Sequence, residues 1–231
     1  QLPTAFASRV SSALIYDHID NEIFIVSDDI SKFSTISSDI ESDLAKLPIL
    51  EEEKISGTVE ILFKGSPEEH QMHVKKCIEY IFQGEIFQAN LSRLWNFKIN
   101  DNLRATDIYR QLRKKNPSPF SGLVNHKNST IISSSPERLV SVNENLLETR
   151  PIAGTRPRGS SGIHDIELSK ELINSDKEKA EHLMLVDLER NDISKVCEPG
   201  SVKVNEMMII ETYAHVHHIV SNIRGSKVKG L

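Results

Sequence analysis

The chain has 231 residues, and 38% of them are hydrophobic, enough for the core of one large domain or two small ones. Lys and Arg number 28 against 33 Asp and Glu, without acidic or basic blocks, so neither nucleic acid nor an anionic membrane is an expected partner. The two cysteines do not form a paired motif, and the sequence has no apolar run of the roughly 20 residues that span a bilayer. We therefore expect a cytoplasmic protein.

The first third of the sequence predicts strands and one capped helix. Two β-rich runs on either side of an Asp-Asn turn pair predict a strand, a turn and a second strand within residues 13–27. Residues 57–65 predict another strand. The sequence SPEE at residues 66–69 gives an N-cap serine, a first-turn proline and a glutamate at the third helical position, which predicts a helix that Gly84 ends.

The segment IFQANLSRLWNF, residues 86–97, predicts a strand that is buried on one side. Its odd positions are mostly apolar and its even positions mostly hold uncharged polar residues, Gln88 among them. This polar face is either a solvated surface or the wall of a cavity. A short helix capped by Thr106 and ended by prolines is expected next, and residues 120–149 predict further strands joined by turns.

Two segments interrupt this strand pattern. SSSPER at residues 133–138 contains Glu137, and RPIAGTRPRG at residues 150–159 places prolines, glycines and arginines around Thr155. The second segment predicts an irregular loop with several free backbone amides. Such a loop either binds an anion or is a solvated connection.

The stretch KEKAEHLMLVDLERND, residues 177–192, predicts a helix with carboxylates on one side. The expected buried stripe on the other side comprises Ala180, Leu183, Met184 and Leu188. Glu178 and Glu181 lie one turn apart, an unfavourable spacing for like charges unless a positive group lies between them. Mg²⁺ is commonly held by one or two carboxylates, so this pair is a candidate metal site. Glu178 also completes a capping box from Ser175, which explains it without a metal.

Several long motifs in a fixed order carry a family resemblance. AEHLMLVDLERND, with RPIAGTRPRG before it and CEPGSVKV and HVHHIVSNIRG after it, resembles the chorismate-utilising enzymes. These include anthranilate synthase component I, aminodeoxychorismate synthase component I, and the isochorismate and salicylate synthases. The resemblance covers most of the chain from about residue 57. It implies an α+β fold, two packed antiparallel β-sheets with helices on the outside, here incomplete.

The resemblance implies a chorismate site that contains Mg²⁺. Glu181 matches the glutamate that binds the ion, and Glu178 matches the one that supports its water shell. Gly154 and Thr155 match the loop that touches the ring carboxylate of chorismate. The metal neutralises that carboxylate and assists departure of an allylic oxygen as a Lewis acid.

Two further matches concern proton transfer. Glu137 matches the candidate general acid, and a carboxylic acid near other carboxylates can keep its proton at neutral pH. His218 matches the histidine beside the leaving hydroxyl. In HVHHIVS one histidine must face inward on a strand, so a core histidine is the alternative interpretation of His218.

Gln88 and Ala153 bear on which family member this is. The isochorismate and salicylate synthases have a water-activating lysine where this chain has Gln88, and glutamine has no basic nitrogen, so ammonia is the expected nucleophile. The resemblance implies a glutamine amidotransferase subunit or fused domain as its source. Four motifs favour aminodeoxychorismate synthase, of the p-aminobenzoate and folate pathway. RPIAGT, with Ala153 in place of a nucleophilic lysine, favours anthranilate synthase, of the tryptophan pathway; a non-catalytic chorismate-binding relative is a third alternative.

The chain opens on Gln1 and lacks the C-terminal motifs of the family, so we expect a piece of a longer protein. Residues 1–231 are expected to form a single partial domain. Within it, residues 57–231 are the N-terminal part of the catalytic domain, and residues 1–56 are preceding strands of the upstream region. The family's second pair of metal-binding glutamates is not in this sequence, so no turnover is expected from this chain alone.

Overall fold

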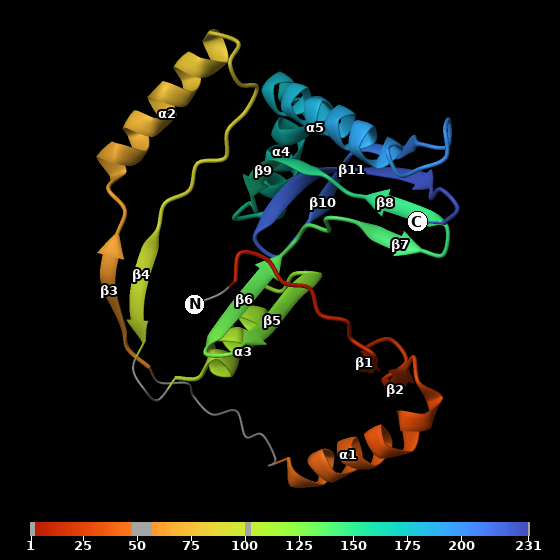
Figure 1. The fold of residues 1–231 in the computed structure, drawn as a ribbon. Coiled ribbons are helices and arrows are strands. Elements are labelled where there is room, and N and C mark those ends of the chain that lie inside the picture. The colour runs from red at the N-terminus through yellow and green to blue at the C-terminus, as the bar shows by residue number, and fades with distance from the viewer. Residues whose placement is uncertain (1–2, 48–56, 100–102, 231) are drawn as a thin grey trace. The chain divides into compact units, whose positions relative to one another are not determined.

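A computed structural model describes residues 3–47, 57–99 and 103–230, which belong to two compact units (Figure 1). The units divide between Asn100 and Asp101. Every strand pair in the described residues is antiparallel, and helices accompany the strands in both units. The expected α+β class with antiparallel sheets is therefore confirmed. No helix in these ranges is long and apolar enough to cross a membrane.

The first unit contains two strand pairs and two long helices. Its elements are β1 Ser12–Asp17, β2 Glu22–Ser27, the 3-10 helix η1 Ile30–Lys32, α1 Phe33–Lys46, β3 Val59–Lys64, α2 Pro67–Phe82 and β4 Trp95–Ile99. β1 pairs with β2, and β3 with β4. Asn21 takes a positive φ of 58° in the first turn, a conformation that asparagine tolerates, which confirms the predicted hairpin.

Helix α2 begins and ends where the sequence predicts. The Oγ of Ser66 accepts a hydrogen bond from Glu69 N at 3.1 Å, and Pro67 occupies the first helical position. Gly84 follows the end of the helix with a φ of 76°. These local signals determine where the helix begins and ends. The serine accepts a hydrogen bond from a free amide of the first turn, the proline has no amide that needs a partner there, and the glycine adopts the positive φ that follows the last turn.

The strand predicted for residues 86–97 is wrong over most of its length. Only β4 forms, paired with β3 between Trp95 and Ile99. A strand needs a hydrogen-bonded neighbour, and β3 ends at Lys64. Among the described residues of this unit, no strand lies beside residues 86–94, so alternation of side chains alone does not produce one.

The second unit is built on a five-stranded sheet with two helices against one face (Figure 1). Its elements are α3 Ala105–Lys115, β5 Phe120–His126, β6 Ser129–Ser135, β7 Ser141–Asn143, β8 Leu146–Thr149, β9 Ile152–Pro157, α4 Gly162–Asn174, α5 Asp176–Ser194, β10 Lys203–Thr212 and β11 Val216–Ser226. β5 and β6 form a separate hairpin. In the main sheet β11 is central: β10 pairs along one edge, and β9 and β8 share the other.

Helix α3 begins without the predicted threonine cap. Arg104 is the N-cap residue, and the carboxylate of Asp107 accepts from its backbone N at 3.1 Å and from its Nε at 3.0 Å. Thr106 lies inside the first turn. The prediction is wrong because the Asp107 carboxylate, three residues into the helix, satisfies the cap amide.

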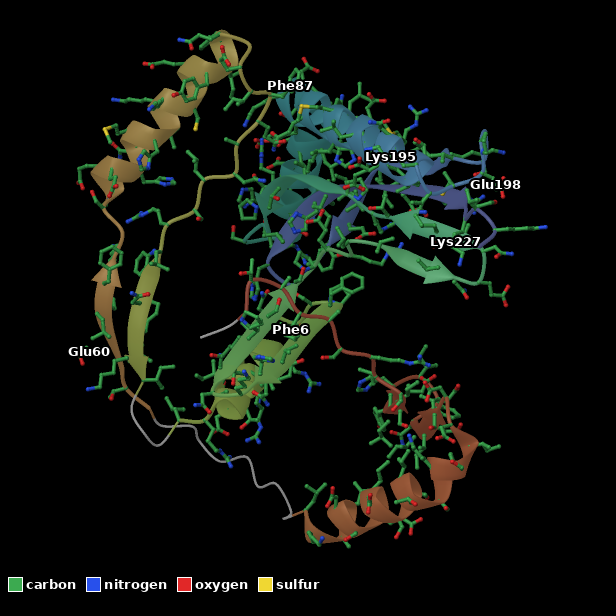
Figure 2. All side chains as sticks on the ribbon, viewed as in Figure 1. Phe6, Glu60, Phe87, Lys195, Glu198 and Lys227 are labelled. Carbon is green, nitrogen blue, oxygen red and sulfur yellow. The ribbon has the colours of Figure 1, made fainter. Side chains whose placement is uncertain are left out.

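The core of the second unit lies between α5 and the sheet. Its buried cluster comprises Leu147, Val186, Ile193, Cys197 and Ile223. Burying a side chain such as Ile223 stabilises the fold by roughly 1.5–3 kcal/mol. Past α5 the chain returns to the end of β11, where Glu198 N donates to Ser226 O at 2.7 Å, near Lys227 in Figure 2. The core thus fixes α5 across the strands that carry the predicted site residues.

Candidate active site

The segment predicted to be an irregular loop, residues 150–159, is a strand over most of its length. β9 pairs with β11 through Ile152 and residues 155–157, so most of this segment belongs to the sheet and is not a free loop. Prolines and glycines are local strand breakers, but the long edge of β11 offers hydrogen-bond partners that override them. Two residues of β9, at positions 153 and 154, oppose Ile219 alone, which is a β-bulge.

Beside this bulge two predicted site residues come into contact. Thr155 and His218 are opposite each other in the ladder, and Thr155 Oγ1 lies 2.9 Å from His218 Nδ1. Burial lowers the pKa of His218, although a hydrogen bond to the Gly154 backbone and the charges of Glu137 and Glu211 act in the opposite direction. The neutral imidazole is therefore favoured, a form with one donor and one acceptor nitrogen.

Of the three histidines in the motif, His217 is the inward one. It is 3% exposed, and its Nε2 lies 2.9 Å from Asp165 Oδ1 and its Nδ1 2.8 Å from Thr212 Oγ1. Arg158 donates to both oxygens of Asp165 at 2.8 Å and lowers the pKa of that carboxyl group. His217 thus ties the sheet to α4, while the half-buried His218 faces the candidate site.

Gly154 brings the strand backbone close to α5. Its φ is 92°, in the left-handed region that favours glycine. A Cβ at this position would lie 3.1 Å from Ile219 Cδ1, 3.2 Å from Leu172 Cδ1 and 3.3 Å from Glu178 Cβ. The predicted residues Gly154 and Glu178 are therefore neighbours across the interface between strand and helix.

An arginine of β9 holds the carboxylate of Glu178. Arg156 Nη1 lies 3.2 Å from Glu178 Oε1 and donates to Thr155 O at 2.9 Å, while Arg156 Nε donates to Glu171 at 2.8 Å. The Oγ of Ser175 accepts from Glu178 N at 3.4 Å, so the serine half of the predicted cap is present. The Glu178 side chain turns to Arg156, the kind of positive neighbour that two closely spaced glutamates require.

Helix α5 packs with a different face toward the sheet than its apolar stripe predicts. Leu183 and Leu188 are 54% and 50% exposed, whereas His182 and Val186 are 0% and 3% exposed. Ala180 is exposed as well, and Met184 is half-buried. Glu181 is half-buried, one turn after Glu178. The prediction is wrong because the sheet offers polar partners to this face, which offsets the cost of burying it.

His182 is the centre of that buried polar contact. Its Nδ1 lies 3.2 Å from Ala153 O and its Nε2 2.7 Å from Ser221 Oγ, which also accepts from Met208 N at 2.9 Å. A carbonyl oxygen only accepts, so Nδ1 carries the proton and Nε2 accepts from the serine hydroxyl. Burial lowers the pKa of His182, which agrees with this neutral tautomer. The network fixes the rotation of α5 above β9 and β11.

Glu137 lies in the turn between β6 and β7 and faces the start of β9. Its Oε1 accepts from Ile152 N at 3.1 Å, and its backbone N donates to Ser135 Oγ at 3.2 Å. Pro136 ends β6, because proline has no N–H for the ladder. The charge of Glu137 acts on His218, so the second unit brings the predicted acid and the predicted histidine into one region.

Three residues that the sequence patterns did not single out, Arg150, Glu211 and Tyr213, form a network that reaches His218. Arg150 donates to Glu211 Oε1 through Nε at 3.0 Å and through Nη2 at 2.5 Å. The Tyr213 hydroxyl donates to Glu211 Oε2 at 2.7 Å, and burial together with this carboxylate raises the pKa of Tyr213 to about 12. The Tyr213 ring meets His218 edge to face at 5.6 Å. Arg150 and Glu211 are 61 positions apart, so no sequence motif contains both of them.

A cavity of ≈ 200 Å³ adjoins these residues. Its walls include Phe120, Arg138, Arg150, Ile152, Glu211 and Tyr213. The Nε of Arg138 is buried and has no hydrogen-bond partner among the described residues. Mostly apolar walls with a few polar groups are typical of small-molecule sites, and the arginines favour a carboxylate ligand.

Gln88 is not among the residues that this unit brings together. It belongs to the first unit, where it is half-buried in the segment between α2 and β4. The strand that was expected to present it does not form there. The structure describes each unit by itself, so the role predicted for Gln88 stays a prediction.

The carboxylates of α5 offer only part of a metal shell. Among the residues that the structure describes, no three His, Cys, Asp or Glu side chains gather closely enough to hold a metal ion. Glu178 and Glu181 remain as a pair of oxygen donors one turn apart. Mg²⁺ is often bound by one or two protein carboxylates with waters and substrate oxygens, so this donor set fits Mg²⁺ and not zinc.

Comparison with known proteins places this arrangement in a family. A family model described as chorismate binding enzyme matches residues 1–231. Anthranilate synthase component 1 of Saccharolobus solfataricus is 43% identical, over 94% of this chain and 47% of its own length. Aminodeoxychorismate synthase component 1 of Bacillus subtilis is 50% identical, over 68% of this chain and 33% of its own length. The crystal structure of anthranilate synthase component I from Streptococcus pneumoniae TIGR4 has a TM-score of 0.78 and 29% identity, covering 96% of this chain and 50% of that one.

The chain spans about half the length, or less, of these relatives. The family match nevertheless includes every segment described above, from the first hairpin to the end of β11. Both the sequence motifs and the fold agree with it. The chain belongs to the chorismate binding enzyme family.

Proposed function

We propose that the protein that carries this chain is a chorismate-aminating enzyme, which replaces a hydroxyl group of chorismate by ammonia to give 4-amino-4-deoxychorismate. The observation that supports this most directly is the hydrogen bond between Thr155 and His218 close to Glu137. It combines a carboxyl group, a neutral imidazole and a hydroxyl donor in one region. Family membership supplies the substrate class.

In this proposal Glu137 is the general acid. As the C–O bond of the substrate breaks and the C–N bond forms, Glu137 gives its proton to the departing hydroxyl, which leaves as water. Ile152 N, 3.1 Å from Oε1, stabilises the carboxylate that remains. His218, kept neutral by burial and held by Thr155, lies beside the leaving group and orients it.

The substrate carboxylate is assigned to the end of β9 and the start of α5. Thr155 and the backbone of Gly154 bind it, and Arg156 restrains Glu178 from behind. Glu181 and Glu178 would hold Mg²⁺, which when bound neutralises the ring carboxylate and assists departure of the allylic oxygen. Two glutamates and one arginine leave net negative charge there, which favours a cation between helix and substrate.

A second candidate product is anthranilate. Ala153 supports it, because an alanine cannot act as the nucleophile that lysine provides in many aminodeoxychorismate synthases, so ammonia has to add directly. Ala153 is buried, with its carbonyl bound to His182. The relatives named above include both kinds of synthase. A non-catalytic relative that binds chorismate is the third candidate.

The remaining assignments concern the whole protein. We infer a glutamine amidotransferase subunit or domain as the ammonia source, which the name component 1 of the relatives supports. Residues 1–231 are proposed to be part of one domain, with residues 57–231 as the N-terminal part of the catalytic region. A cytoplasmic location is likewise proposed.

The test is a product assay of the complete protein with chorismate, Mg²⁺ and ammonium. Formation of 4-amino-4-deoxychorismate, seen as p-aminobenzoate after addition of a lyase, supports the proposal. Anthranilate fluorescence without added lyase would favour the second candidate. If chorismate binds but is not consumed, the third candidate is favoured.

A substitution of Glu181 tests its proposed role in binding Mg²⁺. Glu181→Gln should raise the Mg²⁺ concentration needed for half-maximal turnover and weaken binding of Mg²⁺ measured by calorimetry. Glu167→Gln, the same chemical change at an exposed position of α4, is the matched control. Equal Mg²⁺ affinity in both variants contradicts the role of Glu181.

A further inference from the structure

Three neighbouring strands of the main sheet present a row of side chains at the candidate site. Glu211 of β10 is opposite His218 of β11, and His218 is opposite Thr155 of β9. Residues opposite one another in a sheet project from the same face, with their Cβ atoms about 4.5–5.5 Å apart. His218 therefore has Thr155 on one side, 2.9 Å from its Nδ1, and Glu211 on the other.

Both oxygens of the Glu211 carboxylate are held by other groups. Oε1 accepts from Arg150 through Nε at 3.0 Å and through Nη2 at 2.5 Å, and Oε2 accepts from the Tyr213 hydroxyl at 2.7 Å. Arg150 is fixed in turn, because its Nη1 donates to Glu206 at 2.5 Å. Hydrogen bonds between charged groups are short and strong, so this set fixes the direction of the carboxylate.

The network of Arg150, Glu211 and Tyr213 lies on the face of the sheet that carries His218. Arg150 lies between β8 and β9, which share one edge of β11, and its side chain reaches β10 on the other edge. Val220 lies two residues after His218 and so projects from the same face of β11. It lines the cavity that is also lined by Arg150, Glu211 and Tyr213.

Tyr213 is held at both of its ends. Its backbone N donates to Val216 O at 2.8 Å, and its backbone O accepts from Arg158 Nη1 at 3.0 Å. At the other end the hydroxyl donates to Glu211, which leaves the ring little freedom to move. Between these two ends the ring meets the imidazole of His218 edge to face, with the ring centroids 5.6 Å apart and an angle of 63° between the ring planes.

A single hydrogen bond does not fix the orientation of an imidazole ring, because the ring can tilt about the atom that is bonded. In this site Thr155 holds one nitrogen of His218, and the Tyr213 ring limits the tilt. Aromatic pairs favour this edge-to-face arrangement over a face-to-face one. Small displacements of a group beside the reacting atoms lower the rate strongly, so a second contact with His218 has a consequence for catalysis.

We propose that Tyr213 is a positioning residue for His218. Arg150 and Glu211 hold the tyrosine ring in place, and the ring together with Thr155 keeps the imidazole in one orientation. The proposal rests on the proposed function in one respect, the role of His218 beside the leaving hydroxyl. Tyr213 itself takes no part in proton transfer, because its hydroxyl is bound to Glu211.

The contact is tested without substrate. In the complete protein labelled with ¹⁵N at histidine side chains, the resonances that disappear in His218→Asn identify the His218 ring. Tyr213→Phe keeps the aromatic ring but removes its bond to Glu211, and we expect it to shift those resonances. Tyr109→Phe, the same change at a half-buried tyrosine of α3, is the matched control and should not shift them. If Tyr213→Phe leaves them in place as well, the proposal is overturned.

Turnover of the complete protein tests the positioning role. We expect Tyr213→Phe to lower kcat by about two- to tenfold, the contribution of one hydrogen bond, with KM for chorismate little changed. Tyr213→Leu also removes the edge-to-face contact and should lower kcat further. Tyr109→Phe should leave kcat unchanged. Equal kcat values in Tyr213→Phe and Tyr109→Phe overturn the positioning role.

A double-mutant cycle tests whether Tyr213 acts through His218. In the His218→Asn background, Tyr213→Phe should lower kcat no further, because the ring that it positions is gone. An undiminished effect in that background means that Tyr213 acts on the substrate or on the fold, and it overturns the proposal. If His218→Asn is too slow to measure, Thr155→Val replaces it. Both contacts hold the same ring, so additive effects of Thr155→Val and Tyr213→Phe overturn the proposal.

The outcomes separate this proposal from the proposed function. A protein that does not aminate chorismate contradicts the proposed function, yet the His218 resonances still decide whether Tyr213 orients the imidazole. If Tyr213→Phe does not fold, Glu211→Gln takes its place in the same measurements, because glutamine has one acceptor oxygen where glutamate has two. Glu167→Gln is then the control, and equal resonances and kcat values in these two variants overturn the proposal.

Discussion

Replacing Gly154 by alanine should destabilise the protein by about 2–5 kcal/mol. An L-residue at the φ of 92° costs about 1–2 kcal/mol. The added Cβ would lie 3.1 Å from Ile219 and 3.2 Å from Leu172, and overpacking of this kind costs about 1–3 kcal/mol. Against a total stability of roughly 5–15 kcal/mol, the variant folds but is clearly weakened.

Two other glycines separate these contributions. Gly84 has a φ of 76° and no atom within 4 Å of its added Cβ, so Gly84→Ala should show the conformational cost alone. Gly162 has open space and an ordinary φ, so Gly162→Ala should be neutral or slightly stabilising. Guanidinium unfolding followed by circular dichroism, in the complete protein, measures all three variants.

The order of the three unfolding midpoints tests whether the bulge at Gly154 is strained and closely packed. The expected order of stability is Gly162→Ala, then Gly84→Ala, then Gly154→Ala. If Gly154→Ala unfolds at the same denaturant concentration as Gly162→Ala, the bulge is not strained and the close approach to α5 is refuted. If the order is as expected, KM for chorismate should also rise in Gly154→Ala, because the atoms that make room for the added Cβ include those of Glu178.

Further changes test the cap of α5, the ion pair of Arg158 with Asp165 and the contact of Thr155 with His218. Ser175→Ala removes the N-cap of α5 and should cost about 1 kcal/mol, measured by thermal unfolding; an unchanged midpoint argues against the cap. Arg158 lowers the pKa of Asp165 in the folded state below its ordinary value of 3.8. The ion pair therefore stabilises the fold above pH 3.8, and this stabilisation is lost as the pH falls below that value. Asp165→Asn should remove this part of the acid sensitivity, measured by unfolding at a series of pH values. Thr155→Val removes one hydrogen bond from His218 and should lower kcat/KM by about tenfold or less, while equal values exclude a role for that contact.

The sequence by itself determined the features whose causes are local. The hairpin of β1 and β2 follows from side-chain alternation around a tight turn, and α2 follows from its serine cap and terminal glycine. The order of the motifs was enough to identify the family. These motifs contain Thr155 and His218, which the pairing of β9 with β11 brings into contact. Local hydrogen bonds and steric preferences act within a few residues, so pattern and outcome agree.

Tertiary structure decided the features that depend on a distant partner. β9 is a strand because β11 offers it an edge, and residues 86–94 are not one because no strand among the described residues of their unit lies beside them. Helix α5 turns its polar face inward because Ser221 and the carbonyl of Ala153 satisfy His182. Glu189 of α5 accepts a hydrogen bond from Thr149, 40 positions away. Burial of polar groups is favourable only with partners in place, and the fold alone supplies those partners.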